Sequence, residues 1–221
     1  MEWRVDQRPA YSVLKVKLGP GEAVTAEAGA YLLHRGDVDV ETGTGGLLRG
    51  VLRAALAGEK LFLNTFRART PAEVWLAPSL PGDISYVPLR GDSWIVQDSG
   101  YLAHHGDVEV GVAWRGLKGL LAEGELVWLK LAGEGGVWVN SYGGLEVLRV
   151  GAGERVTLDN FHFVAMPADT SYTIRKLGGW KTLLLGGEGL VVEIEGPATL
   201  VIQTRTLPQL AGELAPFIGE K

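Results

Sequence analysis

The sequence predicts an all-β protein made of three similar units, and three observations support this. A pattern of turn, aromatic residue and later aspartate occurs three times, at a period of roughly 60–70 residues, which is typical of a unit copied along one chain. The chain has 32 glycines and 10 prolines, enough for many turns between short strands. Several short runs alternate apolar and polar residues, as expected for strands with one buried face.

The recurring positions define the first half of each unit. A Gly-acid turn opens it at Gly21-Glu22, Gly91-Asp92 and Gly153-Glu154. An aromatic residue with an apolar neighbour follows at Tyr31-Leu32, Tyr101-Leu102 and Phe163-Val164. An acid then follows at Asp37, Asp107 and Asp169. We interpret these acids as turn formers, because aspartate accepts hydrogen bonds from its own local backbone.

The second half of each unit also recurs. The segments 58–63, 124–129 and 187–192 align with one another, and so do Val74-Trp75-Leu76, Val137-Trp138-Val139 and Leu200-Val201-Ile202. The units therefore span about 11–79, 80–142 and 143–206, followed by a tail at 207–221. A small unit buries a small share of its surface, so we expect one domain over 1–221.

The elements follow in order along the chain. Residues 12–18 alternate and predict a strand, which ends at the turn Gly19-Pro20-Gly21. Glycine before Asp37 and before Asp107 predicts tight hairpins, whereas Pro167 predicts a different turn in the third unit. Further strands are predicted at 94–96, 108–112, 137–139, 191–194 and 199–204. Short helices are predicted at 46–58, at 116–124 and within the tail, around prolines 208 and 216.

Composition excludes several classes of protein. The chain is 46% hydrophobic and 21% charged, which is typical of a folded globule. Without cysteine it has neither disulfides nor a thiolate metal site. A net charge of −5 without a basic cluster argues against nucleic-acid binding. The N-terminus lacks the apolar core of a signal peptide, and no apolar run is long enough for a transmembrane helix. We therefore expect a cytoplasmic protein.

Four stretches of the sequence, 58–66, 100–111, 136–167 and 186–205, resemble a known family. They are most specific at Tyr142-Gly143-Gly144, at Leu158-Asp159-Asn160 leading to Ala165, and at Gly196-Pro197 with Gln203-Thr204-Arg205. The chain resembles, over nearly its whole length, the bacterial branch of the altered-inheritance-of-mitochondria family. The resemblance implies the β-sandwich fold of the tryptophan-RNA-attenuation-protein (TRAP) superfamily, with three copies around a pseudo-threefold axis. It implies no catalytic residue. The mitochondrial branch is linked to inner-membrane organisation, but this chain shows no targeting segment.

The histidines are the only candidates for a metal site. His34 and His104 occupy equivalent positions in two units, and pseudo-symmetry could bring them together with Asp37 and Asp107. A zinc or iron site needs about three such ligands, and the spacing of these residues fits no metal motif. The alternative is that they are strand-end histidines beside hairpin turns. No glycine run is followed by the residues of a phosphate loop, and no serine lies in a nucleophile elbow.

These observations favour a non-enzymatic scaffold or interaction protein without a cofactor. One alternative is a small-molecule-binding protein with pockets between the units; another is a metal-dependent enzyme that uses the histidines. Open strand edges must be paired, covered or charged, so we expect self-association as a trimer or hexamer, alongside a possible unknown protein partner. The poorly guarded runs 191–194 and 199–203 are the predicted open edges, with 207–218 covering one of them or reaching a neighbour. Trp75 and Trp138 are predicted to be mostly buried.

Overall fold

A computed structural model describes residues 1–43, 62–115, 127–176 and 190–218. It is almost entirely antiparallel β-sheet with one α-helix near the C-terminus, which confirms the predicted all-β class and helical tail. The helices predicted at 46–58 and 116–124 lie outside the described residues.

The strands fall into three segments, which we call the first, second and third. The first follows β1 (Glu2–Asp6) and contains β2 (Val13–Leu18), β3 (Ala23–Glu27), β4 (Tyr31–Arg35), β5 (Val38–Gly43), β6 (Leu63–Ala68) and β7 (Ala72–Leu76). The second contains β8 (Ile84–Gln97), the 3-10 helix η1 (Asp98–Gly100), β9 (Tyr101–Arg115) and β10 (Val127–Asn140). The third contains β11 (Leu145–Val150), β12 (Arg155–Asp159), η2 (Asn160–His162), β13 (Phe163–Pro167), β14 (Tyr172–Lys176), β15 (Leu190–Glu195) and β16 (Ala198–Gln203). The chain then forms α3 (Leu207–Leu214) and η3 (Ala215–Phe217).

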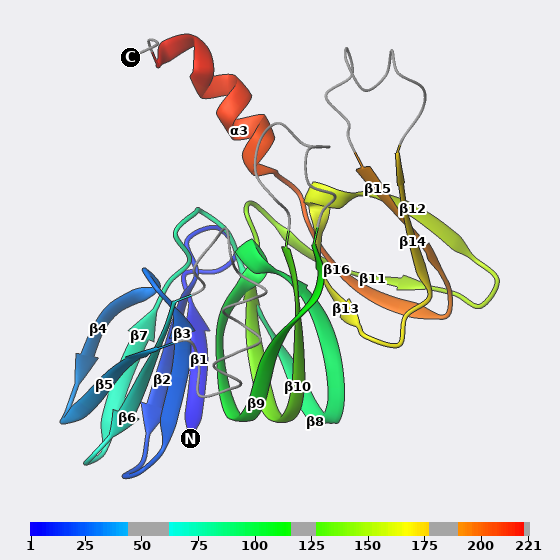
Figure 1. Cartoon of the computed structure of the whole chain (residues 1–221). Coiled ribbons are helices and arrows are strands. Elements are labelled where there is room, and N and C mark those ends of the chain that lie inside the picture. The colour runs from blue at the N-terminus through cyan, green and yellow to red at the C-terminus, as the bar shows by residue number, and fades with distance from the viewer. Residues whose placement is uncertain (44–61, 116–126, 177–189, 219–221) are drawn as a thin grey trace.

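The segments follow one another across the molecule, with β4 and β5 at one end and β12, β14 and β15 at the other (Figure 1). The central sheet has nine strands in the order β11-β16-β13-β8-β10-β9-β3-β6-β5. A four-stranded sheet, β1-β2-β7-β4, belongs to the first segment, and a three-stranded sheet, β12-β15-β14, belongs to the third.

Strands pair by one scheme in all three segments. In the first segment β7 pairs with β2 and β4, and β6 pairs with β3 and β5. In the third segment β16 pairs with β11 and β13, and β15 pairs with β12 and β14. In the second segment each two successive strands of this scheme are replaced by one long strand. The long strand β10 pairs with β8 on one side and with β9 on the other.

A β-bulge occurs at the same place in each scheme. The register of the pair shifts between Tyr31 and Leu33, between Tyr101 and Ala103, and between Phe163 and Ala165. The extra residue of a bulge bends its strand and redirects its side chain. The bulged residues are thus Leu32, Leu102 and Val164, the apolar neighbours of the recurring aromatic residues.

Successive segments are joined at both junctions by a pair of equivalent strands. The strand β3 pairs with β9 between the first and second segments, and β8 pairs with β13 between the second and third. Parallel bridges link Tyr11 to Gly82 and Gly82 to Gly143. Among the described strand pairs β12 does not pair with β4, the contact that would close three segments around an axis. The expected pseudo-threefold axis is therefore not shown by the pairing.

Hydrogen bonds to the buried residue Asp83 connect the first segment with the second. Its carboxylate accepts hydrogen bonds from Arg8 Nη2 at 2.7 Å, Ser12 Oγ at 2.8 Å and the Ile84 amide at 2.8 Å. Its own amide donates to Ser141 Oγ at 3.1 Å. We call these residues the Asp83 cluster; it ties the start of the first segment to both ends of the second.

The core forms three hydrophobic clusters that cross the segment boundaries. Trp138 is fully buried, as predicted, and lies with Val24 and Ala26 of the first segment. Trp75, its equivalent, is less buried than Trp138 but is still mostly covered, so the prediction holds for both. Lys15 lies over the ring of Trp75, with its Nζ 3.6 Å from the ring centroid. The same position is thus more deeply buried in the second segment than in the first, because different strands cover it.

The predicted open edges are also wrong. The run 191–194 lies in β15, between β12 and β14, and the run 199–203 lies in β16, between β11 and β13. Both strands are therefore paired on both sides. The tail does not cover an edge, since none of the residues of α3 is buried.

Candidate functional site

The structure separates the residues that were candidates for a metal site. His34 lies on β4 and His104 on β9, in different sheets, while Asp37 and Asp107 lie beside the turns at Gly36 and Gly106. Among the described residues there is no group of three His, Asp or Glu side chains able to hold a metal ion. Each of the two histidines contacts a tyrosine instead.

The tyrosine and histidine form the same pair in two segments. Tyr31 and His34 approach to 3.0 Å between the hydroxyl and Nδ1, and Tyr101 and His104 approach to 2.7 Å between the same atoms. The ring centroids are 5.9 Å apart in both pairs. Local sequence and the bulge thus fix the geometry of the pair, wherever it lies in the molecule.

The surroundings of the two pairs differ completely. Strand β3 lies beside β9, with Thr25 opposite His104, and the Tyr101 hydroxyl also donates to the Thr25 carbonyl at 3.4 Å. Burial, with a smaller contribution from His105, lowers the pKa of His104 to about 4. Burial and the charge of Glu27 raise the pKa of Tyr101 well above its ordinary value. The covered pair is therefore held neutral.

The uncovered pair marks an open strand edge. Tyr31 is 43% exposed and Leu32 is 51% exposed, whereas Tyr101 and Leu102 are fully buried and Phe163 and Val164 nearly so. The cause is pairing, because β9 and β13 each have a neighbour from the preceding segment, whereas β7 is the only described strand that pairs with β4. We call β4 with its exposed Tyr31 and Leu32 the β4 edge.

A second open edge lies at the other end of the molecule. Within the described part of the chain, β12 pairs with β15 alone, although its counterparts β3 and β8 each pair with the following segment. Thr157 is exposed on it, and Val156 and Leu158 are half-buried. We call this strand the β12 edge. Figure 1 shows the two edges at opposite ends of the molecule.

A half-buried acid lies close to the covered junction. Glu27 ends β3, and burial, with a smaller contribution from the charge of Asp98, raises its pKa to about 8. The folded protein therefore holds this proton more tightly than the unfolded chain does, whose glutamate titrates near pH 4.3. By linkage, this group lowers stability as the pH rises from about 4 to about 8.

We expect Glu27→Gln to raise the urea midpoint of unfolding at pH 8.5, because the amide needs no deprotonation. The gain should be much smaller at pH 4.5, where the folded protein already keeps Glu27 neutral. Glu41→Gln on exposed β5 is the control and should leave both midpoints unchanged. An equal gain at both pH values would show that titration is not the cause.

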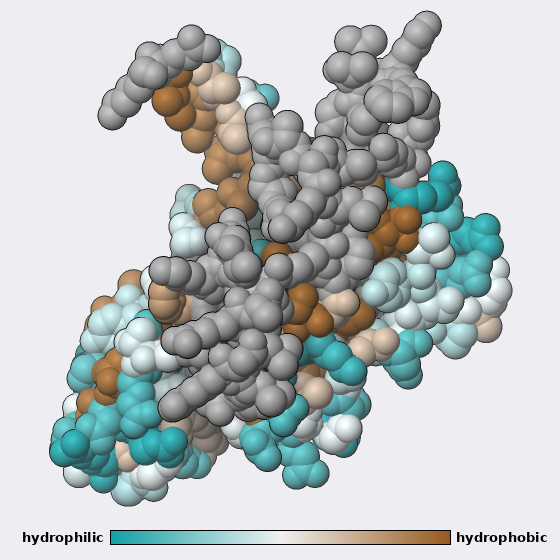
Figure 2. All heavy atoms as spheres, in the orientation of Figure 1, coloured by the Kyte–Doolittle hydropathy of each residue, from teal (hydrophilic) through white to brown (hydrophobic). Residues whose placement is uncertain are grey.

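Apolar side chains also gather on the C-terminal helix (Figure 2). Leu207, Leu214, Phe217 and Ile218 are exposed there. The helix begins at Thr206, whose hydroxyl accepts a hydrogen bond from the Gln209 amide at 3.3 Å. Helix capping of this kind stabilises the helix end itself, so α3 is a formed element rather than an extension of β16.

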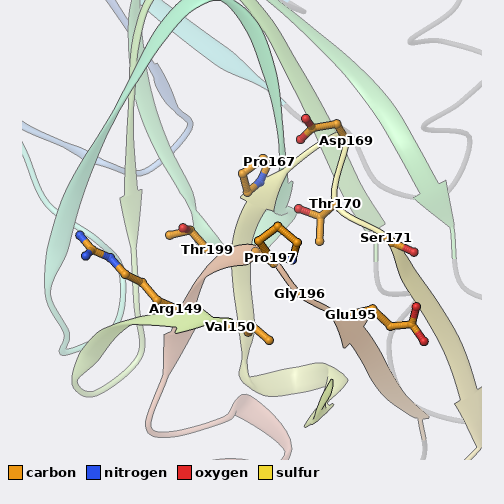
Figure 3. A pocket seen from close by; sticks show the side chains of 11 residues that line it. Arg149, Val150, Pro167, Asp169, Thr170, Ser171, Glu195, Gly196, Pro197 and Thr199 are labelled. Atoms are coloured by element: carbon orange, nitrogen blue, oxygen red, sulfur yellow. The ribbon is translucent and has the colours of Figure 1, made fainter. Parts of the chain in front are cut away.

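A polar pocket of about 610 Å³ lies at the ends of strands in the third segment (Figure 3). Arg149, Asp169 and Glu195 contribute charges to its wall, and Pro167 and Pro197 contribute apolar surface. In Figure 3 the Arg149 side chain points away from Asp169, so the charges do not converge on one point. All its lining residues come from one segment, so it does not match the expected pockets between units.

The Tyr-Leu recurrence is visible in the sequence, but there it only marks the repeat and indicates no site. The stretches 31–40 and 101–110 are nearly identical in sequence. One of them lies at an open edge and the other does not, and this difference becomes visible only when the strand pairs are known. The β12 edge has no comparable motif.

The family model described as "Mitochondrial biogenesis AIM24" matches residues 3–205. An uncharacterized protein of Streptococcus pyogenes serotype M6 is 25% identical over 227 residues, covering 99% of this chain and 91% of that protein. A crystal structure of a Streptococcus pyogenes protein matches with a TM-score of 0.83 and 25% identity, covering 98% of this chain and 99% of that one. In the described part of the chain, no helix is both long and apolar enough to cross a bilayer.

Proposed function

From the premise that this chain belongs to the AIM24 mitochondrial biogenesis family, we propose that it is a non-enzymatic scaffold that assembles with copies of itself through the β4 edge. The observation that carries the proposal is that one surface is buried in the second and third segments but exposed in the first. Tyr101-Leu102 and Phe163-Val164 are covered by a neighbouring strand, while Tyr31-Leu32 is not.

The energetics favour covering the β4 edge. Removing apolar surface from water contributes about 25 cal/mol per Å², and Tyr31 stacks on Phe66 at 5.3 Å, so its ring is already positioned. An unpaired strand also presents free backbone donors and acceptors, which a second strand satisfies.

The arrangement of three units is part of the same proposal. We infer that the three segments are copies of one TRAP-like β-sandwich unit. The shared pairing scheme and the shared bulge support this. The test is an experimental structure in which 12–78, 82–141 and 144–206 superpose, and a different strand order in any of them would overturn it.

Leu32→Lys is expected to break the assembly. A lysine on the bulge of β4 would have to be buried beside the incoming strand, and an unpaired buried charge is strongly unfavourable. In multi-angle light scattering at low micromolar concentration, the parent chain should give a multiple of its 23.7 kDa, as a trimer or a hexamer of two trimers. The variant should give the mass of one chain.

Val40→Lys is the matched control, since Val40 is 50% exposed on the neighbouring strand β5 of the same segment. It should leave the oligomeric mass unchanged. A parent mass of one chain at every concentration would remove the proposal, and equal losses in both variants would point to a general effect of added charge.

A further inference from the structure

We propose that the strand covering the β4 edge is β12 of a second copy of this chain, so that copies join head to tail. This inference rests on the proposed self-assembly and names the partner surface. The two open edges are the only places where the junction scheme of the described segments is incomplete.

The internal junctions define which strands belong together. At each of them the strand that carries the recurring aromatic residue pairs with the strand that follows the Gly-acid turn of the preceding segment: β9 with β3, and β13 with β8. The first segment offers an aromatic strand without a partner, β4, and the third offers a turn-following strand without a partner, β12. The two strands that one more junction needs are thus both present in the same chain, β4 in its first segment and β12 in its third.

The spacing of residues fixes the register. Thr25 lies opposite His104, and Ile95 lies opposite Met166, three residues after Tyr101 and Phe163 respectively. Thr157 precedes Phe163 by the same number of residues as Thr25 precedes Tyr31 and Ile95 precedes Tyr101. The equivalent pair across two chains therefore places Thr157 opposite His34.

Side-chain chemistry agrees with this register. Tyr101 donates to the carbonyl of Thr25 at the covered junction, and Thr157 would offer Tyr31 the same carbonyl. Val156 and Leu158 are half-buried and would become covered, as Val24 and Ala26 are in β3. The new sheet would combine the four strands β1-β2-β7-β4 with the three strands β12-β15-β14.

Joining unlike edges also fixes the symmetry. A head-to-tail contact closes into a ring or continues as a filament, whereas contact between two β4 edges would give a twofold dimer and stop. A ring of three chains satisfies the expected trimer and leaves no β4 or β12 edge open.

The natural chain has no cysteine, so engineered thiols report on contacts without background. Two single variants, His34→Cys and Thr157→Cys, are purified, mixed and treated with an oxidant or a short bis-maleimide. Residues directly opposite on antiparallel strands have Cβ atoms about 4.5–5.5 Å apart, close to the separation that a disulfide requires. Thr173→Cys is the matched control, because Thr173 is exposed on β14, two strands from Thr157 across Glu193.

The mixture of His34→Cys with Thr157→Cys should give a covalent dimer on a non-reducing gel, and each variant alone should give none. The mixture with Thr173→Cys should also give none. A chain that carries both His34→Cys and Thr157→Cys should give covalent species larger than a dimer, which only head-to-tail contact allows.

The outcomes separate this inference from the proposed function. Cross-linking of His34→Cys with itself would show that two β4 edges meet, which overturns head-to-tail joining and keeps self-assembly. Oligomers by light scattering without any cross-link to Thr157→Cys would also overturn it. The mass of one chain for the parent and for every variant would overturn the proposed function itself.

Discussion

Trp138→Ala is expected to lower the free energy of unfolding by about 3–5 kcal/mol, the range for replacing a packed tryptophan by alanine. Trp138 is fully buried in the cluster that joins the first and second segments. Its ring lies 5.8 Å from Trp3, 5.5 Å from Tyr86 and 5.2 Å from His105, measured between centroids. The cavity would therefore remove support from three other rings. The measurement is urea unfolding followed by far-ultraviolet circular dichroism.

Trp75→Ala is the matched control, because Trp75 holds the equivalent position in the first segment. Its ring is partly exposed beneath Lys15, so truncation leaves a surface recess rather than a cavity. We expect it to cost clearly less than Trp138→Ala. Equal losses for the two variants would contradict the difference in burial on which the prediction rests.

Asp83→Ala is the second large effect, and we expect it to lower the free energy of unfolding by about 1–3 kcal/mol for each buried hydrogen-bond donor that loses its acceptor. The change leaves Ser12 Oγ and the Ile84 amide without their acceptor in a buried region. Asp39→Ala is the control: Asp39 pairs with Arg69 on the surface, where solvent screening leaves such pairs little effect on stability.

The Asp83 cluster also predicts a dependence on pH. Burial raises the pKa of Asp83, but hydrogen bonds from Arg8, Ser12 and the Ile84 amide outweigh it and hold that pKa below its ordinary value. The folded-state pKa is thus lower than the unfolded one, so this stability is present above about pH 4 and is lost as the pH falls further. The difference in stability between the parent and Asp83→Asn should shrink on acidification below pH 4. A constant difference from pH 7 to pH 3 would contradict this.

The class of the fold could be predicted from sequence because its signals are local. Alternation at 12–18 and glycine beside Asp37 and Asp107 depend only on neighbouring residues. The pairing of distant strands has no such signal. The runs 191–194 and 199–203 have the composition of unguarded edges, yet each lies between two strands, because apolar composition suits a central strand equally well.

The open edges could not be predicted for a related reason. Tyr31-Leu32 and Tyr101-Leu102 are the same dipeptide in the same local structure, and only the presence of β3 beside β9 makes one pair core and the other surface. Trp75 and Trp138 differ in depth of burial for the same kind of reason. A repeated sequence specifies repeated local structure, but the position of each copy among its neighbours decides what its residues contact.

The long strands of the second segment have a consequence for how the molecule opens. Strands β8, β9 and β10 contain 14, 15 and 14 residues, and each runs without interruption through what are two separate strands elsewhere. Native-state amide hydrogen exchange proceeds through local openings of contiguous cooperative units. In the first and third segments a single short hairpin can open while the rest stays folded. In the second segment an opening has to propagate along whole strands, so its central amides should exchange last, near the rate set by global unfolding.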